Sequence, residues 1–506
     1  MKHKKHNCLK SILVWLLLAA MMLPSCSEQT ADPESESEVE TVAPAAVSEE
    51  TEIAEETERE YLDDLPETYD MNGREFHFYL ADVDHITLGN RSIVVAEDTT
   101  GDLVNDAVFR RNERLNQRFN ATITLMQEAQ DKLVTTIRSI VSSGSADYDV
   151  SVGYQAYAIA ASAEGLLFDL ADSEYLNFDA DYWATELIDN MSYKGQIYWG
   201  TGDITMKYLG GVSVTYVNER LKTDYLPDAD LYDDVDSGTW TMDKLYGYTA
   251  DTYIDLNEDG KADIEDQYGF MLTCEDPMDA AVVGAGIAYT TYDENNIPAI
   301  TIDAERMTSF FEKMSQLLKD NTNAFICPGD DNKTYMTTFA QGNTLFAINK
   351  LYMTEFYFRD MEDDYLILPL PKLDENQENY RSATHDGVAI YGIPVTAQGT
   401  EETEMLLEAM AADSKKIVTP AYLDGALKNK YSRDADTARM VDLVLSNTFS
   451  DFAMQYHRSV GMISHFYREI FSGNNDSIAS ALASKEKSWN KTLERLLASF
   501  EENIEG

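Results

Sequence analysis

The chain has 506 residues, 44% of them hydrophobic and 11% aromatic, which is enough apolar material for the cores of two lobes or domains. Its 39 basic and 90 acidic residues give a formal net charge of −51. A surface this negative repels polyphosphates and argues against nucleic acid as a partner, and it also disfavours anionic ligands.

The first 25 residues are typical of a secretory signal peptide. The basic segment MKHKKHNCLK precedes a 13-residue apolar stretch, Ser11 to Leu23, which is too short to span a bilayer comfortably. The next residues, Leu23-Pro24-Ser25-Cys26, resemble the lipobox of bacterial lipoproteins, in which the cysteine becomes the lipidated first residue. Pro24 departs from the usual small residue, so a plain secretory signal is the alternative. We expect lipidation of Cys26, which would anchor the protein at the extracellular face of the cell membrane.

Residues 26–66 are expected to form a disordered tether between the lipid and the folded part. Between Ser27 and Pro66 the chain has 15 acidic residues and one basic residue, together with Ser, Thr, Ala and Pro. Such a segment buries too little apolar surface to offset the entropy lost on ordering it.

A β-α-β-α-β order is predicted at the start of the folded part. In REFHFYL (74–80), Phe76, Phe78 and Leu80 alternate with other residues, which indicates a strand. The elements that follow are a helix at 103–119, a strand at 121–127, a helix ended by Gly144 and a strand at 148–153. This order predicts a parallel sheet flanked by helices. Ligands of such sheets bind beyond the carboxyl ends of the strands, so the segment that follows the last strand is a candidate binding surface.

The second part of the chain alternates strands and helices less regularly. We expect a hairpin at 190–204, a strand from 211 that leads into a helix, a helix within 237–253, strands at 268–274 and 365–373, and an amphipathic helix at the C-terminus. The prolines in 365–373 favour an edge strand or a segment that crosses between the lobes. A further helix, at 304–320, has one apolar face made of Met307, Phe310, Phe311, Met314 and Leu317.

The segment DLNEDGKADIED (255–266) has the spacing of a calcium-binding loop. Gly260 at its sixth position allows a sharp turn, and hard oxygen ligands at this spacing suit Ca²⁺. The predicted ligands are the side chains of Asp255, Asn257, Asp259, Asp263 and Asp266 and the backbone carbonyl of Lys261. An acidic turn without metal is the alternative. We expect a structural calcium ion that stabilises the fold and lies remote from any ligand.

Motifs for catalysis are not found in the sequence. It lacks H-E-x-x-H, G-x-S-x-G, a Walker loop and C-x-x-C, and GAGIAY (284–289) lacks the third glycine of a dinucleotide fingerprint. The 90 carboxylates do not single out a catalytic pair. We therefore predict that the protein is not an enzyme, with a calcium-containing carbohydrate-active enzyme as the minority alternative.

The order of several segments resembles the extracellular solute-binding proteins of ABC transporters, in particular the sugar-type (family 1) lipoproteins of Gram-positive bacteria. The resemblance covers nearly all of residues 72–500 and rests on the number and order of the segments, since each one alone is loose. They are LLFDLADSEYLN (166–177), YKGQIYWGTGDI (193–204), VSVTYVNERL (212–221), GTWTMDKL (238–245), the calcium-like loop, FAQGNTLFAIN (339–349), LPLPKL (368–373) and THDGVAIYGIP (384–394).

This resemblance implies an α/β fold of two lobes, the type II fold of periplasmic binding proteins, with hinge crossovers and a cleft between the lobes. Lobe I would comprise residues 67–205 and about 375–475. Lobe II would comprise residues 206–374, and the segment from about 476 to 506 would belong to lobe II or form a helix that bridges the lobes.

Aromatic and polar side chains near predicted strand ends are the candidate ligand-binding residues. Sugars present apolar faces that stack on Trp or Tyr, and hydroxyls that pair with polar side chains. The candidates are Tyr154 and Gln155 after the third strand, Trp199 and Asp203 at the first passage between lobes, Asn349 at a strand end and Asp386 at the return crossover. Packing within a lobe is the alternative for each of them.

The resemblance implies capture of a small solute, a mono- or oligosaccharide, by cleft binding and hinge closure, and its delivery to the permease subunits of an ABC transporter. Capture of a peptide or an amino acid by the same fold is the alternative. We expect a monomer. Cys274 and Cys327 remain in the folded part, and their separation favours two separate thiols while leaving a disulfide open.

Overall fold

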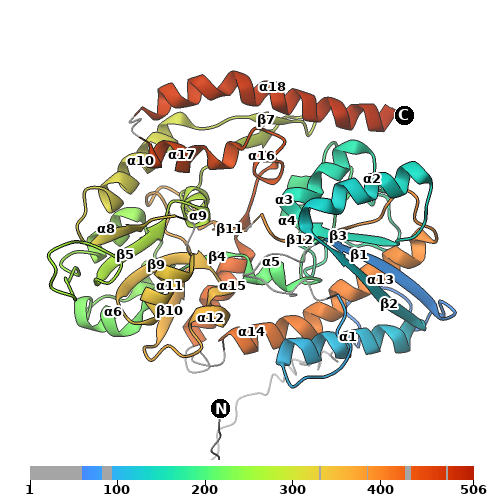
Figure 1. The fold of residues 1–506 in the computed structure, drawn as a ribbon, viewed down its shortest axis with the longest axis horizontal. Helices are drawn as coiled ribbons and strands as arrows, with labels where there is room; N and C mark the ends of the chain where they lie inside the picture. The colour runs from blue at the N-terminus through green and yellow to red at the C-terminus, as the bar shows by residue number, and fades with distance from the viewer. Residues whose placement is uncertain are drawn as a thin grey trace, which may run out of the picture. The chain divides into compact units, whose positions relative to one another are not determined.

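The computed structural model describes residues 60–81, 94–329, 332–384, 386–427, 435–473 and 477–505. The predicted signal peptide, the predicted lipidation site Cys26 and most of the predicted tether lie outside these residues. Within the described ranges, no helix combines the length and the apolar character needed to cross a membrane. Residues 59–506 form one compact unit, in which two lobes lie side by side (Figure 1).

Lobe I is built on a four-stranded sheet with the order β12-β3-β1-β2, in which only β12 is antiparallel. The predicted β-α-β-α-β order is confirmed by the order of the elements along the chain. As predicted, Phe76 and Phe78 of β1 are fully buried, and α2 ends at Gly144, which has the left-handed conformation. The strands are β1 (Arg74–Ala81), β2 (Ala121–Glu128), β3 (Val150–Tyr154) and β12 (Ala389–Gly392). The helices are α1 (Leu103–Phe119), α2 (Leu133–Ser143), α3 (Gln155–Ala158), α4 (Thr185–Met191) and α13 (Thr400–Asp413), with the 3-10 helices η1 (Gln130–Lys132) and η2 (Ile159–Glu164).

Lobe II contains a five-stranded sheet with the order β10-β4-β9-β5-β8, in which β10 is an edge strand that ends directly before Pro369. All five apolar residues predicted for one face of α10 are buried in its core. The strands are β4 (Ser213–Asn218), β5 (Tyr268–Thr273), β8 (Ala324–Cys327), β9 (Thr344–Lys350) and β10 (Tyr365–Leu368), with a separate hairpin of β6 (Thr290–Tyr292) and β7 (Pro298–Ile300). The helices are α6 (Glu219–Tyr225), α7 (Leu231–Asp236), α8 (Met242–Tyr248), α9 (Asp276–Gly284), α10 (Ala304–Leu318), α11 (Asn332–Ala340) and α12 (Met353–Tyr357).

The lobes are joined by chain segments that lie next to one another and form the hinge. Helix α5 (Met206–Gly210) leads from lobe I into β4, and Val212 beyond it forms an antiparallel bridge with Thr384. Strand β11 (Ser382–Ala383), on the return path to lobe I, pairs in parallel with β13 (Thr448–Phe449). Three segments that are far apart in the sequence therefore meet in a narrow band between the two sheets.

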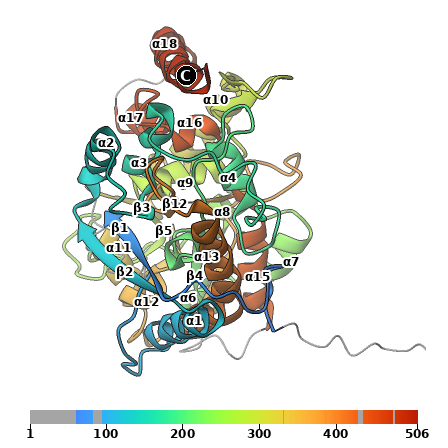
Figure 2. The same cartoon turned by 90° about the vertical axis from the view of Figure 1, so that its right-hand side faces the viewer.

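The late helices do not all belong to lobe I, which differs from the expected division of the chain. Helix α15 (Ala435–Ser446) packs on β10 and α17 (Phe466–Ser472) packs on α9, both in lobe II. Helix α18 (Ile478–Glu505) runs along the top of both lobes and contacts α10 of lobe II and η2 of lobe I (Figures 1 and 2). The remaining helices of this part are α14 (Thr419–Leu427), which contacts α1 and α12, α16 (Phe452–Gln455) and the 3-10 helix η4 (Ile463–His465).

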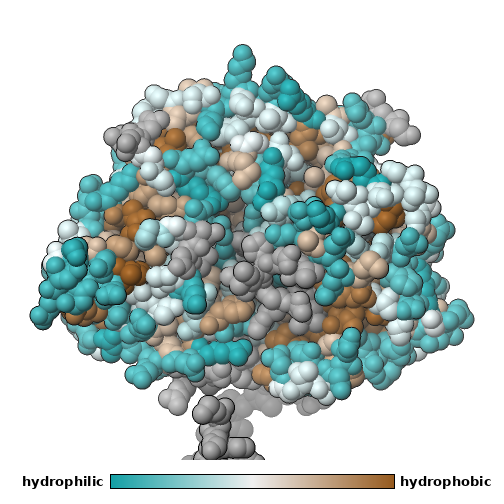
Figure 3. Space-filling model, viewed as in Figure 1, coloured by the Kyte–Doolittle hydropathy of each residue, from teal (hydrophilic) through white to brown (hydrophobic). Residues whose placement is uncertain are grey.

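Two local predictions differ from the structure. The predicted hairpin at 190–204 is only a tight turn, in which Lys194 and Gly195 have positive φ, because residues 190–191 end α4 and the later residues make isolated bridges. Residues 60–66, assigned above to the tether, pack against α1, where the carboxylate of Asp63 forms a buried ion pair with Arg118. Hydrophilic side chains cover most of the face seen in Figure 3, with smaller hydrophobic patches between them.

Candidate functional site

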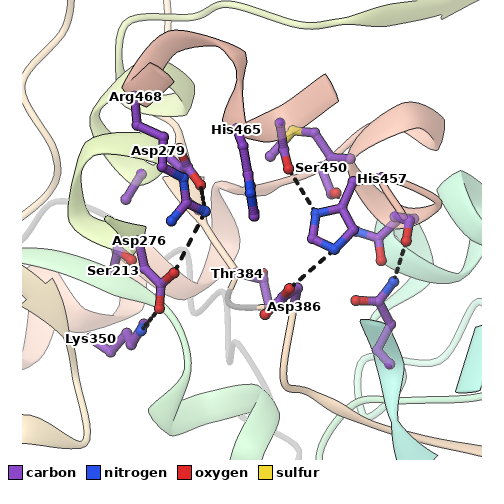
Figure 4. A pocket seen from close by; sticks show the side chains of 16 residues that line it. Ser213, Asp276, Asp279, Lys350, Thr384, Asp386, Ser450, His457, His465 and Arg468 are labelled. Atoms are coloured by element: carbon purple, nitrogen blue, oxygen red, sulfur yellow. Dashed lines mark hydrogen bonds and ion pairs between the residues drawn. The ribbon is translucent and has the colours of Figure 1, made fainter. Parts of the chain in front are cut away.

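A polar cavity lies at the hinge, between the two lobes and the C-terminal helices (Figure 4). Its free volume is about 60 Å³, well below the roughly 300–1,000 Å³ of typical ligand pockets. The lining residues are Gln155, Ser213, Asp276, Asp279, Ala280, Lys350, Ala383, Thr384, Asp386, Ser450, Met454, Gln455, His457, Ser464, His465 and Arg468.

The position of this cavity follows from the direction of the strands. Strand β3 of lobe I ends directly before Gln155, β9 of lobe II ends at Lys350, and α9 begins at Asp276 shortly after the end of β5. The carboxyl ends of parallel strands from both sheets therefore point to the same space, which is where open α/β sheets bind ligands. The hinge segments contribute its base through Ser213, Thr384 and neighbouring residues.

One wall of the cavity is a network of ion pairs around two largely buried cations. Lys350 Nζ lies 2.5 Å from an Asp276 oxygen, and its side chain is only 4% exposed. Arg468 pairs with Glu275 and, at 2.5 Å, with Asp279, and lies 3.9 Å from Asp276. Burial raises the pKa of Asp279 well above its usual value, although Arg468 opposes the change. Burial alone would lower the pKa of Lys350, but Asp276 reverses the shift and the pKa is raised.

The facing wall contains two histidines and a carboxylate. His457 Nδ1 lies 2.7 Å from Ser464 Oγ, and its Nε2 lies 3.4 Å from Asp386 Oδ2. Burial lowers the pKa of His457, and burial together with Arg468 and His457 lowers the pKa of His465 to about 4. Both imidazoles are therefore neutral at pH 7.

The histidine pair predicts an acid-sensitive site. The pKa of His465 is about 4 in the folded protein and 6.5 for an ordinary histidine, which is the value expected in the unfolded chain. At pH values between 4 and 6.5 the unfolded chain therefore binds more protons than the folded one. The contribution of His465 to the free energy of unfolding therefore has its full value above pH 6.5 and declines as the pH falls toward 4. Urea unfolding from pH 7.5 to 4.5 should show a larger loss of unfolding free energy for the native chain than for His465→Gln. Parallel losses in the two proteins would contradict this assignment.

The structure brings together three of the six predicted ligand-binding residues. Gln155 and Asp386 line the cavity, and the hydroxyl of Tyr154 donates a hydrogen bond of 3.3 Å to Asp386. Asn349 precedes the lining residue Lys350 but does not itself line the cavity, because its side chain is buried and donates to Tyr335 Oη at 2.5 Å.

The prediction that Trp199 faces the cleft is wrong. Its side chain is 1% exposed and lies in the core of lobe I, where Nε1 donates to Ser162 Oγ at 2.9 Å and the ring packs on Gly392. The spacing of residues in the sequence cannot show whether Trp199 faces the cleft or the core. The segment around it forms isolated bridges rather than a regular strand with alternating faces.

Asp203 lines a second groove of about 720 Å³. It accepts a hydrogen bond from Thr419 and lies 3.5 Å from Lys415. Burial raises the pKa of Asp203, although Lys415 and Thr419 oppose the change. Trp183 and Tyr208 also line this groove. Asp203 is therefore not among the residues that line the cavity at the hinge, although Ser450 lines both spaces.

Most of the charged residues of the cavity were not predicted from the sequence. Asp276 and Asp279 stand at the start of a helix directly after a predicted strand, which is the one local signal that points to them. Lys350 follows the candidate Asn349, whereas His457, His465 and Arg468 come from the C-terminal part of the chain and reach the cavity only through tertiary packing.

The calcium-like loop folds into a tight turn between α8 and β5. Gly260 has a φ of 75°, and its N–H donates to Asp255 Oδ2 at 2.9 Å. Asp259 and Asp266 accept hydrogen bonds from backbone N–H groups of the loop, and no cluster of three metal-ligating side chains is found among the described residues. In the same part of the structure, Asp255 Oδ1 is buried without a hydrogen-bond partner, which fits an oxygen reserved for a cation.

Cys274 and Cys327 are not joined by a disulfide, as the sequence analysis favours. Cys327 is opposite Thr273 in the β5–β8 pairing, so the next residue, Cys274, lies toward the other face of the sheet.

The predicted two-lobe α/β fold is confirmed by its similarity to solved two-lobe binding proteins, several of which are sugar-binding. Over 83% of this chain and 99% of the other, the structure is similar to the cyclic alpha-maltosyl-1,6-maltose binding protein from Arthrobacter globiformis, with a TM-score of 0.56 and 13% identity. It is also similar to the GacH receptor of Streptomyces glaucescens, solved unliganded and with acarbose, with a TM-score of 0.53, 14% identity and the same coverage.

A third similar structure is UgpB from Mycobacterium tuberculosis in complex with glycerophosphocholine, with a TM-score of 0.51 and 13% identity over 85% of this chain and 99% of that one. No family model matches the chain, and a search of curated proteins finds no match. At these identities the comparisons establish the fold, and the solute has to be inferred from the cavity itself.

Proposed function

We propose that the protein captures a small solute outside the cell, a mono- or oligosaccharide, and delivers it to the permease subunits of an ABC transporter. The observation that supports this function is the polar, charge-lined cavity enclosed between two lobes at a three-segment hinge. Two of the similar proteins are described as binding an oligosaccharide or acarbose. The protein acts by binding alone and carries out no chemical step.

The mechanism is opening and closing about the hinge. Gln155 belongs to lobe I, whereas Lys350 and Asp276 belong to lobe II. Separation of the lobes would therefore expose the lobe I side and the lobe II side of the cavity. A solute that contacts both walls favours the closed state by its higher affinity for that state. The closed form is the one that docks on the transporter.

Lipidation of Cys26 would hold this unit near the permease. The acidic segment that follows the cysteine would serve as the tether. Metabolic labelling with a fatty-acid analogue, compared between the native chain and Cys26→Ala, tests this anchor.

The function is tested by identifying the solute that the protein carries. Residues 59–506, produced as the compact unit, should release a saccharide on denaturation, detected by mass spectrometry of the supernatant. Asp386→Asn is the matched variant and should release less of it, since Asp386 lines the cavity. A co-purified peptide or amino acid would favour the other solute class of this fold, and a reaction product from a glycan would contradict a pure binding role.

We also propose that the loop 255–266 binds one structural Ca²⁺ ion through the ligands predicted above, supported by the buried Asp255 Oδ1 and the turn at Gly260. Asp255→Ala should abolish stoichiometric calcium binding in isothermal titration calorimetry and remove the rise in melting temperature that calcium produces in the native chain. Glu265→Ala is the control, because it removes an exposed charge at a position that is not a ligand. Equal melting temperatures of the native chain in calcium and in chelator would contradict the proposal.

A further inference from the structure

Helix α18 connects the two lobes at a distance from the hinge. In Figure 1 it runs along the top of the molecule, above the hinge strand β11, and Figure 2 also shows it at the top. It contacts α10 of lobe II and η2 of lobe I. Separation of the lobes about the hinge therefore has to detach α18 from one of them.

The middle of α18 is fixed to lobe II. Trp489 is 3% exposed, and its ring packs edge-on against Phe466 of α17, with 5.2 Å between the ring centroids. Lys485 forms an ion pair of 3.3 Å with Glu469 of the same helix. This part of α18 is therefore expected to move with lobe II.

The end of α18 is fixed to lobe I by an aromatic cluster. Phe500 is fully buried, and its ring centroid lies 5.1 Å from that of Tyr193 and 6.3 Å from that of Tyr198, on which it stacks. Both tyrosines belong to the segment of lobe I that follows α4. These distances are those of favourable aromatic pairs, so the cluster adds to the stabilisation from the apolar surface that Phe500 buries.

Two polar contacts accompany Phe500. Asn503 Nδ2 donates a hydrogen bond of 2.8 Å to the backbone carbonyl of Ala163 in η2. Glu501 accepts one of 2.6 Å from the hydroxyl of Tyr193 and pairs with Lys194. The side chains of Glu501 and Lys194 are each 37% exposed, so their ion pair contributes little, and Phe500 makes the main contact.

The aromatic cluster continues into the wall of the cavity. The ring centroid of Tyr456 lies 5.8 Å from that of Phe500, and the Tyr456 hydroxyl donates to the backbone carbonyl of Met191, the last residue of α4, at 2.9 Å. Tyr456 stands between Gln455 and His457, which both line the cavity. Lobe I therefore meets the end of α18 and the cavity wall along one continuous surface.

We propose that Phe500, Glu501 and Asn503 form a latch that holds the lobes in the closed state and controls access to the cavity. When the lobes separate, Phe500 has to leave a fully buried site, and the free energy of exposing its ring to water opposes opening. The inference rests on the proposed function, because it specifies how the closed state of the binding protein is held. The proposed function does not require a latch, so the latch can be wrong while the proposed function stands.

The test measures how often the cavity opens in residues 59–506 without any solute. A reporter thiol is introduced as Ala280→Cys, since Ala280 lines the cavity on α9 and is 3% exposed. Iodoacetamide should react at this position in the open state, and peptide mass spectrometry reads it separately from Cys274 and Cys327. Adding Phe500→Ala should raise the labelling rate at position 280 at least about tenfold, because the closed state loses its main contact with lobe I.

Two variants are the controls. Ile504→Ala truncates a side chain of the same turn that is 40% exposed. Phe119→Ala removes a phenyl ring that is equally buried, but at the end of α1. Both should leave the labelling rate at position 280 within about twofold of that of the reporter chain. An equal increase in Phe119→Ala would show that a general loss of stability opens the cavity, and would overturn the inference.

A disulfide across the latch should have the opposite effect. A Cβ atom at Gly165 would lie 3.5 Å from Asn503 Cβ, which is within the range for a disulfide. Gly165 has a φ of 65°, a left-handed conformation that a cysteine adopts at some cost. Gly165→Cys/Asn503→Cys, oxidised in the reporter chain, should lower the labelling rate at position 280 at least about tenfold.

An unchanged rate in folded Phe500→Ala, checked by circular dichroism, would overturn the inference, and so would an unchanged rate in the crosslinked chain. If Phe500→Ala does not fold, the crosslinked chain decides alone. These outcomes leave the proposed function in place, because the co-purified solute decides it.

Discussion

Trp199→Ala is expected to lower the free energy of unfolding by about 3–5 kcal/mol, the usual cost of truncating a fully buried large aromatic side chain. The indole lies in the core of lobe I, and its contact with Gly392 is so close that a Cβ atom at that glycine would lie 2.8 Å from the ring. Truncation leaves a cavity that the surrounding groups are expected to fill only in part. The loss also removes the hydrogen bond from Nε1 to Ser162 Oγ.

Urea unfolding followed by circular dichroism measures this loss, with Phe168→Ala as the control, because Phe168 is 39% exposed. The control should change the free energy of unfolding by less than about 1 kcal/mol. At low temperature, where Trp199→Ala remains folded, its affinity for the solute should equal that of the native chain. A stable variant with weakened binding would contradict the core position and return Trp199 to the cleft.

Asp63→Ala is expected to destabilise the protein by about 3–5 kcal/mol, because it leaves the buried guanidinium of Arg118 without its counter-ion. Both side chains of the pair are 0% exposed, and the two hydrogen bonds between them measure 2.6 and 2.8 Å. The ring of Tyr61 covers the guanidinium at 3.8 Å from its centroid. The segment that carries Asp63 and Tyr61 therefore shields the charge of α1 from water.

Two further variants separate the ion pair from a general effect of charge. Glu67→Ala removes an exposed carboxylate from the same segment and should change the unfolding free energy by less than about 1 kcal/mol. The double variant Asp63→Leu/Arg118→Met, which removes both charges, should be more stable than Asp63→Ala. If Asp63→Ala proves as stable as Glu67→Ala, residues 60–66 contribute nothing to the folded unit.

Periodic patterns in the sequence predicted the elements that depend on local forces. The alternation of Phe76, Phe78 and Leu80 identified β1, and the apolar face of residues 304–320 identified α10. These predictions succeed because a strand or helix with one apolar side can be buried in only one orientation. The segment around Trp199 lacks such a period, and there the prediction of the exposed side was wrong.

The sequence by itself determined the alternation of strands and helices, the two-lobe class that follows from it, and the end of β3 as one edge of the site, through Tyr154 and Gln155. These features depend on residues close to one another in the chain. Tertiary structure alone decided which charges meet in the cavity. Arg468 pairs with Glu275 and Asp279 across almost 200 positions, and His457 reaches Asp386 only after the C-terminal segment has folded back over both lobes. No local pattern records such encounters, because the ion pairs and the desolvation that set their protonation exist only in the folded state.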